Sequence, residues 1–267
     1  MDRVCGDRGA HYDCRRVRET FPINGILDKP VWKRAEKTRP FVDLVTGGPA
    51  LFGTRAAALW DEKALYVAYW IDEPEVKASL TERDSLIWYD NDVELFFDGE
   101  DCYYEFEINA FNTVYEVFFI YHDALKRGSR FDRAGFDLYN REVDVLCGFQ
   151  DPGRFRKDPR GRRWAFMDFD FPGLASGVHV EGKINDPSHI DKGWTVELAF
   201  PWEGFRLLNP GKNFPPKDGD SIRWQLFRFE NLRANGKDLT SAGWALNEHG
   251  TYDSHLPRHF AWLHFKE

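Results

Sequence analysis

The sequence predicts an all-β protein, specifically an antiparallel, jelly-roll-like β-sandwich with long loops and little helix. Short runs of alternating apolar and polar residues recur along the chain, and turn residues separate them, which is typical of sandwiches. Aromatic residues, which favour strands, make up 16% of the chain, and helical periodicity is nearly absent. We find no linker and no repeat. We therefore expect an N-terminal arm at residues 1–20 and a single domain at residues 21–267.

The stretch 92–97 alternates like a half-buried strand, and we build the functional hypothesis around it. Val93 and Leu95 share one face, whereas Asp92 and Glu94 share the other. A period of two places these two sets on opposite sides of a sheet. The strand therefore presents carboxylates on its polar face.

The other elements follow from the same two signals, alternation and turn residues. The run 64–71 is apolar on both faces, so we expect it to be a central strand covered on both sides. Trp32 is expected to anchor a short helical segment into the core. Strands are expected at residues 54–71 (two strands around a turn at 61–63), 92–97, 103–110, 114–121, 141–147, 164–169, 178–184, 194–200, 221–229 and 260–265, and short helices at 30–35 and 201–205.

Charge and composition exclude several classes of partner. A net charge of −8 argues against nucleic acid, whose phosphates are bound by Lys and Arg. The chain has no 18-residue apolar run, so no membrane span is expected. The first eight residues lack the hydrophobic stretch that a signal peptide contains, so the sequence does not assign the protein to a cellular compartment. The four cysteines form no C-x-x-C unit, which argues against structural zinc and leaves disulfides open: Cys5, Cys14, Cys102 and Cys147.

An aromatic residue beside inward carboxylates is chemically suited to holding a sugar. Trp88 stands just before the strand that carries Glu94. Its ring would cover the apolar face of a sugar ring, and the carboxylate would accept hydrogen bonds from hydroxyl groups. The same residues also fit a buried Trp beside ordinary solvated acids.

Two other constellations compete with this hypothesis. Glu94 and Glu107, on neighbouring strands, could be the paired carboxylates of a glycoside hydrolase, which needs two acids at a defined separation. Four histidines near the C-terminus invite a metal site, but Pro257 between the second and third makes a shared helical face implausible. These histidines are His249, His255, His259 and His264.

Six sequence blocks resemble family 9 carbohydrate-binding modules, in the order in which that family has them. They run from about Phe21 to the C-terminus, and the chain resembles a divergent member. The blocks are Ile23-Asn-Gly-Ile-Leu-Asp-Lys-Pro-Val-Trp, Leu59-Trp-Asp-Glu-Lys-Ala-Leu-Tyr-Val-Ala, Trp88-Tyr-Asp-Asn-Asp-Val-Glu-Leu-Phe-Phe-Asp, Tyr104-Glu-Phe-Glu-Ile-Asn, Gly193-Trp-Thr-Val-Glu-Leu-Ala-Phe-Pro-Trp and Leu256-Pro-Arg-His-Phe-Ala-Trp-Leu.

The resemblance implies a β-sandwich that clamps a sugar between two aromatic rings, with acid and amide side chains bonding its hydroxyls. By motif position, Trp88 resembles the first clamp aromatic, Glu94 the acid and Asn109 the amide. Glu107 stands where the family carries an Arg, and no second clamp Trp is present. Tyr252 is the nearest candidate for that second position.

Two further residues complete the predicted ligand site. Arg228 lies in a late strand, where its cation could replace the missing Arg, and His255 lies in the same terminal loop as Tyr252. The predicted function is non-catalytic binding of a mono- or oligosaccharide or a glycan chain end, with no catalytic residue. The alternatives are a glycoside hydrolase and a sandwich module that has lost its sugar.

The resemblance also implies a structural calcium ion, an association with xylan and polysaccharide degradation, and an extracellular or periplasmic location. Acids in the turn after strand 92–97, at Asp98, Glu100 and Asp101, are plausible calcium ligands, although no EF-hand spacing is present. They also fit solvated acids that protect a sheet edge.

Overall fold

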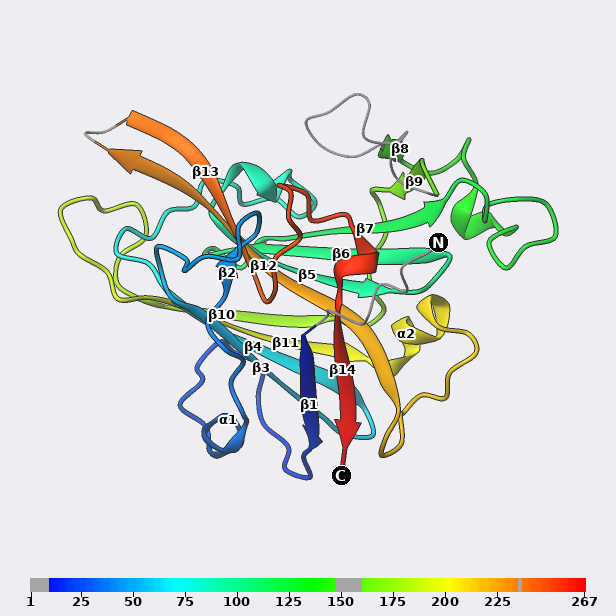
Figure 1. Cartoon of the computed structure of the whole chain (residues 1–267), viewed down its shortest axis with the longest axis horizontal. Coiled ribbons are helices and arrows are strands. Elements are labelled where there is room, and N and C mark those ends of the chain that lie inside the picture. Colours follow the sequence, from blue (N-terminus) through cyan, green and yellow to red (C-terminus); the bar gives the residue numbers. More distant parts are fainter. Residues whose placement is uncertain (1–9, 147–159, 235–236) are drawn as a thin grey trace, which may run out of the picture.

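The computed structural model describes residues 10–146, 160–234 and 237–267 and shows a β-sandwich, as the sequence predicts (Figure 1). The strands, in chain order, are β1 His11–Arg16, β2 Val42–Asp43, β3 Thr54–Trp60, β4 Ala64–Asp72, β5 Asp92–Asp98, β6 Cys102–Asn109, β7 Val114–Tyr121, β8 Val143–Leu146, β9 Arg163–Phe166, β10 Ala175–Glu181, β11 Gly193–Pro201, β12 Ser221–Ala234, β13 Lys237–Ala245 and β14 Ala261–Lys266. Helices are few and short: α1 Pro30–Arg34, α2 Trp202–Leu208 and the 3-10 turns η1 Ile87–Tyr89, η2 Ala134–Phe136 and η4 Pro257–His259.

The strands form one hydrogen-bonded path that bends into two layers. Its order is β10-β11-β4-β3-β1-β14-β12-β5-β6-β7-β9-β8, and β13 pairs with both β12 and β2. The long strand β12 joins the layers, because its first residues pair with β14 and its later residues pair with β5 and β13. Most pairs are antiparallel, but β1 lies parallel to both β14 and β3. Residues 11–16, within the expected N-terminal arm, are therefore a strand inside the sheet.

The main hydrophobic core lies between the two layers. Val67 of β4, Leu95 of β5 and Leu198 of β11 are fully buried in it. The Tyr69 hydroxyl also donates a 2.9 Å hydrogen bond to the backbone oxygen of Glu94, which ties β4 to β5 across this core. The other face of β4 packs under the segment that carries α1, where Trp32 is 1% exposed. Strand β4 is thus covered on both sides, as its apolar alternation predicts.

A second apolar cluster covers the opposite face of the β5–β7 layer. Phe96, Tyr103 and Phe227 are buried there beneath loops rather than beneath another sheet layer. This face therefore carries two kinds of side chain, aromatic rings and the acids of β5 and β6. The loops above it leave the hollow described below.

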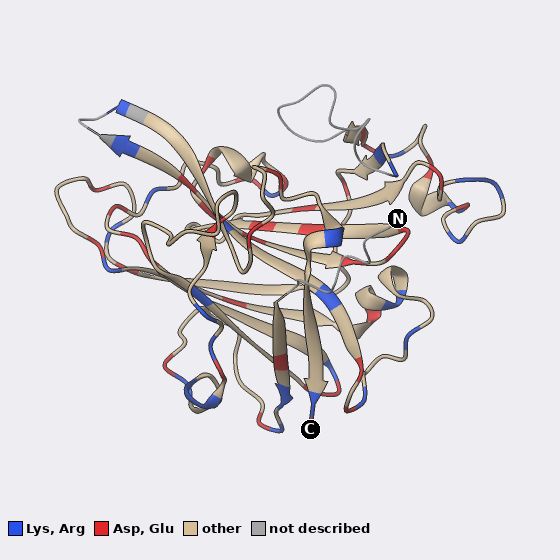
Figure 2. Cartoon of the chain, viewed as in Figure 1, with Lys and Arg blue, Asp and Glu red and all other residues tan. Residues whose placement is uncertain are grey.

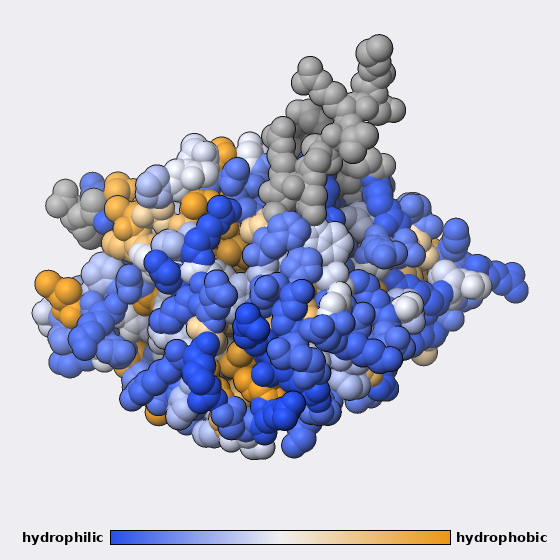
Figure 3. Space-filling view, turned by 60° about the horizontal axis from the view of Figure 1, so that its bottom comes forward, coloured by the Kyte–Doolittle hydropathy of each residue, from blue (hydrophilic) through white to orange (hydrophobic). Residues whose placement is uncertain are grey.

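Acidic residues lie in the central strands as well as in loops, and one face of the molecule is mostly hydrophilic (Figure 2 and Figure 3). Figure 2 shows acidic segments within the central strands β5 and β6, as well as in loops. The face shown in Figure 3 is largely hydrophilic, and its hydrophobic side chains lie in separate spots. No helix in the described ranges is long and apolar enough to cross a membrane. Cys14 and Cys102 are buried free thiols, whereas Cys5 and Cys147 lie outside the described residues.

Candidate functional site

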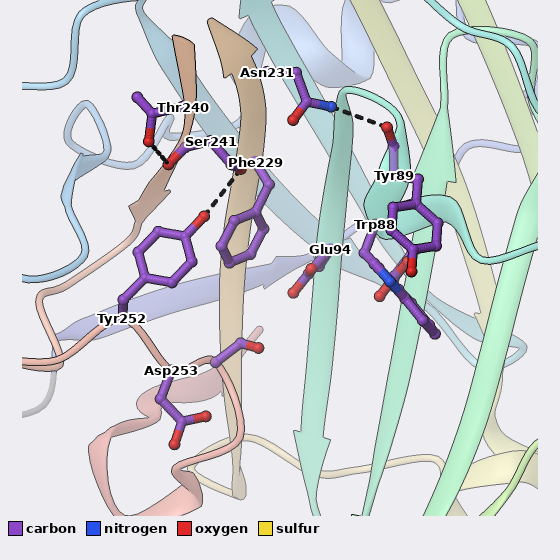
Figure 4. Close-up of a pocket in the computed structure, with 11 residues that line it drawn as sticks. Trp88, Tyr89, Glu94, Phe229, Asn231, Thr240, Ser241, Tyr252 and Asp253 are labelled. Atoms are coloured by element: carbon purple, nitrogen blue, oxygen red, sulfur yellow. Dashed lines mark hydrogen bonds between the residues drawn. The ribbon is translucent and has the colours of Figure 1, made fainter. Parts of the chain in front are cut away.

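A pocket of about 380 Å³ lies on the outer face of strands β5, β6 and β12 (Figure 4). This volume falls within the roughly 300–1,000 Å³ that is usual for small-ligand sites. The pocket mixes aromatic rings, carboxylates, hydroxyls and an amide. Its lining residues are Trp88, Tyr89, Glu94, Glu107, Phe229, Asn231, Thr240, Ser241, Tyr252, Asp253 and Ser254.

The strand period of two puts the acids of the pocket side by side. Val93 and Leu95 point into the core between the layers, so Asp92 and Glu94 point to the outer face. The register then sets Glu94 directly opposite Glu107 of β6, and Asp92 opposite Asn109. We call the carboxylates of Asp92, Glu94 and Glu107 the acid floor. Three acids from two neighbouring strands therefore meet beneath the pocket.

The acid floor is buried and only partly hydrogen-bonded. Its three side chains are at most 3% exposed, and they offer carboxylate oxygens within 4.8 Å of one another. One oxygen of each, Asp92 Oδ2, Glu94 Oε2 and Glu107 Oε2, has no hydrogen-bond partner.

Two causes act together on the pKa values of these acids. Burial raises the pKa of all three carboxyls, because the charged form loses its hydration. Neighbouring carboxylates raise each pKa further: Glu107 acts on both Asp92 and Glu94, and Glu105 acts on Glu107. A hydrogen bond from the backbone of Trp88 opposes this shift at Glu107. The floor is therefore poised to take up a proton, a cation or a hydrogen-bond donor.

Aromatic side chains form two facing walls of the pocket. Trp88 and Tyr89 belong to η1, and the Trp88 ring packs edge-on against Tyr115 at a centroid distance of 5.2 Å. On the other side, the rings of Phe229 and Tyr252 meet edge-on at 5.6 Å. Figure 4 shows these two pairs on opposite sides of Glu94. The predicted partners Trp88 and Tyr252 thus line one pocket together, above the predicted acids.

The loop that carries Trp88 is held by buried hydrogen bonds. The Asp90 carboxylate accepts from the backbone N–H of Ser79 and of Leu80, and from the Asn109 amide at 2.9 Å. These bonds, with the Ser79 hydroxyl, lower the pKa of Asp90, although burial acts to raise it. The Asn109 amide also donates to the backbone oxygen of Leu80 at 2.8 Å. The structure thus places Asn109 under the loop and outside the pocket lining.

The opposite wall is held by two buried histidines. His249 Nδ1 donates to the backbone oxygen of Asp253 at 2.7 Å, since a carbonyl can only accept, and Nε2 lies 2.9 Å from the Gln225 amide. Burial lowers the pKa of His249 to about 3, so the ring is neutral. His255 is 1% exposed, and its ring nitrogens lie 3.0 Å from the Tyr103 hydroxyl and 3.4 Å from Glu105. His255 therefore supports this wall from behind and does not line the pocket.

Arg228 requires a correction, because the structure places it on the other face of β12. Phe227 and Phe229 face the acid floor, so the intervening Arg228 points the opposite way. Its guanidinium lies 2.8 Å from Glu230 and 3.5 Å from Glu73, and it donates to the backbone oxygen of Asp72. We call Arg228, Glu230 and Glu73 the ion network. Arg228 is 0% exposed there and cannot replace a sugar-binding cation.

The β12–β13 hairpin supplies a part of the pocket that the sequence patterns did not predict. Asn231, Thr240 and Ser241 come from this hairpin, and the predicted strand ended at Phe229, before the first of them. The signal that could have found it is Asn-Gly at 235–236, a dipeptide typical of hairpin turns, although these two residues lie outside the described part of the chain. Asp253, Ser254 and Tyr89 were not among the predicted site residues either.

A group of acids that could hold a metal ion lies away from the turn after β5. In the turn after β5, Asp101 is already paired with Arg160 at 3.1 Å, and Asp98 accepts the backbone N–H of Glu100. Within the described ranges, the group whose ligand atoms are close enough for one ion is the acid floor.

Comparison with known proteins agrees with this fold. The sequence matches carbohydrate-binding family 9 over residues 55–130, which span β3 to β7, and this confirms the predicted resemblance. No curated protein matches the chain. Among solved structures, a proposed carbohydrate-binding protein from Bacteroides uniformis has a TM-score of 0.59 at 16% identity, with 97% of this chain and 100% of that chain covered.

A second solved structure is a family 9 carbohydrate-binding module from Caldicellulosiruptor kristjanssonii in complex with cellotriose. Its TM-score is 0.53 at 12% identity, with 96% of this chain and 94% of that chain covered. At these identities, the likenesses show the β-sandwich fold.

Proposed function

We propose that this chain, which matches carbohydrate-binding family 9 over residues 55–130, is a non-catalytic saccharide-binding protein. The observation that carries the proposal is the arrangement of the pocket: aromatic walls on both sides of buried acids, in a hollow of about 380 Å³. The C. kristjanssonii structure of the same fold was solved with cellotriose, which supports a saccharide as the ligand class. The proposed ligand is a mono- or oligosaccharide or a glycan chain end.

Each part of the pocket has a role in this proposal. Trp88 and Tyr252 cover the apolar faces of a sugar ring, and Trp88 is 36% exposed, so its ring is accessible for stacking. Glu94 and Glu107 accept hydrogen bonds from sugar hydroxyls with oxygens that lack partners. Asn231 and Ser241 offer further polar groups at the rim. Such a site needs shape and placed hydrogen bonds, but no activated nucleophile.

A glycan array followed by titration of the best ligands tests the proposal. Wild-type protein should bind a defined set of saccharides, and Tyr252→Ala should weaken that binding about tenfold, the loss expected for an aromatic contact of about 1.4 kcal/mol. Tyr139→Ala is the matched control, because Tyr139 is 94% exposed and does not line the pocket. A Tyr252→Ala variant that binds like the control would reject the clamp.

The hydrolase alternative rests on Glu94 and Glu107 and has its own measurement. Release of reducing sugar from the bound oligosaccharide, lost in Glu94→Gln, would replace the non-catalytic proposal with an enzyme. The proposal predicts that the wild-type protein binds the oligosaccharide and releases no product.

A further inference from the structure

We propose that the acid floor binds a calcium ion, with Asp92, Glu94 and Glu107 as its protein ligands. This site differs from the turn after β5, where the sequence led us to expect calcium. The acid floor lies at the bottom of the pocket, so the ion would be part of the ligand-binding surface.

The spacing of the carboxylates fits a single ion. Calcium is bound by oxygens at about 2.3–2.6 Å, so two ligands of one ion can be at most about 5 Å apart. The ligand oxygens of the acid floor all lie within 4.8 Å of one another. Calcium also tolerates irregular geometry, whereas magnesium demands a near-ideal octahedron. Three side chains from two neighbouring strands can therefore converge on one calcium ion without a dedicated loop.

The hydrogen bonding of these acids independently points to a missing partner. Asp92 Oδ2, Glu94 Oε2 and Glu107 Oε2 are buried and accept no hydrogen bond. Buried charges are normally paired or coordinate a metal. Among the described residues, no Lys, Arg or His forms an ion pair with any of the three. Register sets Glu94 directly opposite Glu107, a like-charge pair that destabilises a sheet unless something bridges it. A divalent cation would satisfy all three orphaned oxygens at once.

The pocket supplies the open side that such an ion needs. Calcium takes about six to eight oxygen ligands, more than three carboxylates provide. Glu94 and Glu107 line the pocket, so the remaining positions of the ion would face it. Water would fill these positions in the free protein, and neighbouring hydroxyls of a saccharide would replace that water on binding. Each hydroxyl would bind the ion through its oxygen and donate its hydrogen to a carboxylate of the acid floor, which has lone pairs for both. Only this last step rests on the proposed function; calcium binding by the acid floor does not.

Direct binding of calcium to the purified full chain tests the site. Calorimetric titration at neutral pH should show one calcium ion per chain, and Glu107→Gln should weaken it at least tenfold while keeping the side-chain shape. Terbium in place of calcium should give luminescence sensitised by Trp88 and Tyr89, because both rings line the same pocket. The signal should fall as calcium is added, and it should be lost in Glu107→Gln.

Asp101→Asn is the matched control, because it removes one carboxylate from the turn where Arg160 already pairs with it. This variant should bind calcium like the wild type. An equal loss in Asp101→Asn and Glu107→Gln, or no calcium binding at millimolar concentration, would overturn the proposed site. Thermal unfolding of each variant shows whether it is folded, and calcium should raise the melting temperature of the wild type but not of Glu107→Gln.

Saccharide titrations with calcium and with a chelator separate this inference from the proposed function. Calcium binding that depends on Glu107, without any saccharide binding, would keep the ion site and reject the proposed function. Saccharide binding unaffected by the chelator, in a protein that binds no calcium, would overturn the ion site and keep the proposed function.

Discussion

Two groups of buried acids lie close together in this sandwich, the ion network and the acid floor, and they differ in their partners. In the ion network, Glu73 accepts from the Trp194 indole at 2.6 Å and from the Asn91 amide at 2.8 Å, and Glu230 pairs with Arg228. In the acid floor, each carboxylate keeps an oxygen without a donor. Buried polar groups normally have hydrogen-bond partners. The carboxylates of the ion network have them, so we assign this group a structural role. The carboxylates of the acid floor lack some of them, so we treat this group as a ligand site.

The same backbone produces both groups. Strand β12 turns Arg228 toward the ion network and turns its neighbours Phe227 and Phe229 toward the outer face. The Asn91 amide donates to both acids of the ion network, and Asn91 immediately precedes β5, whose Asp92 begins the acid floor. The group whose carboxylates are all hydrogen-bonded thus fixes the strand ends from which the acid floor projects. Substitutions in the two groups should therefore affect different properties.

The largest effect is expected from Arg228→Met, which breaks the ion network. Removing one partner of a buried ion pair leaves uncompensated charge and typically costs about 3–5 kcal/mol. Urea unfolding monitored by fluorescence should show this loss in the free energy of unfolding. The exposed pair of Arg34 and Glu19 provides the control, since Arg34→Met should cost less than about 1 kcal/mol. Equal small losses in both variants would remove the distinction between the two groups.

An intermediate effect is expected from pH, through His249 in the wall beside the acid floor. Its pKa is about 3 in the folded protein, because burial disfavours the charged ring, against about 6.5 in an unfolded chain. The unfolded chain therefore binds the proton first, and stability falls as the pH drops from about 6.5 toward 3. This group should contribute a loss of roughly 2.5 kcal/mol between pH 7 and pH 4.5.

The change His249→Asn keeps a donor for the Asp253 carbonyl and removes the titrating ring. Denaturant unfolding at several pH values should show a shallower loss of stability toward acid than in the wild type. The exposed His179 serves as control, and His179→Asn should keep the wild-type profile. A His249→Asn profile parallel to that of the wild type would exclude His249 as the source of the dependence.

The smallest effect on stability is expected from Glu94→Gln in the acid floor. This change removes a buried charge that has like-charged neighbours, so in calcium-free buffer the free energy of unfolding should change by no more than about 1 kcal/mol. Saccharide binding should nevertheless weaken strongly, because one acceptor oxygen for a sugar hydroxyl is replaced by an NH2 group that can only donate. A loss of stability as large as that of Arg228→Met would mean that the acid floor is structural too.

The sequence predicted the half of the site that depends on local periodicity. Glu94 and Glu107 lie where alternation along β5 and β6 places them, because a period of two is a local property of the chain. Trp88 and Tyr252 meet in one pocket because two loops converge, which the family resemblance anticipated. The prediction that Arg228 belongs to the ligand site was wrong. Both faces of β12 are buried, so the pattern of apolar residues does not indicate which face contacts the acids.

The remaining differences concern distance and long-range pairing. Asn109 and His255 lie near the pocket, but each bonds a neighbour beneath the surface, and sequence spacing carries no such distances. Residues 237–245 form β13, but they alternate poorly and gain their strand structure by pairing with β12 and β2. This wall of the pocket therefore depends on pairing between strands that are distant in the sequence. Such dependence is common for strands whose residues have a weak intrinsic β-propensity.

The central claim, that the aromatic walls above the acid floor hold a saccharide, is tested most directly by calorimetric titration of Trp88→Ala. The ligand would be the saccharide that the wild type binds best. The expected result is about thirtyfold weaker binding, the loss of roughly 2 kcal/mol that is typical of a central aromatic contact, with unchanged stability. Trp262→Ala, a tryptophan on β14 outside the pocket, should bind like the wild type. Equal affinity in Trp88→Ala and the wild type would contradict the account.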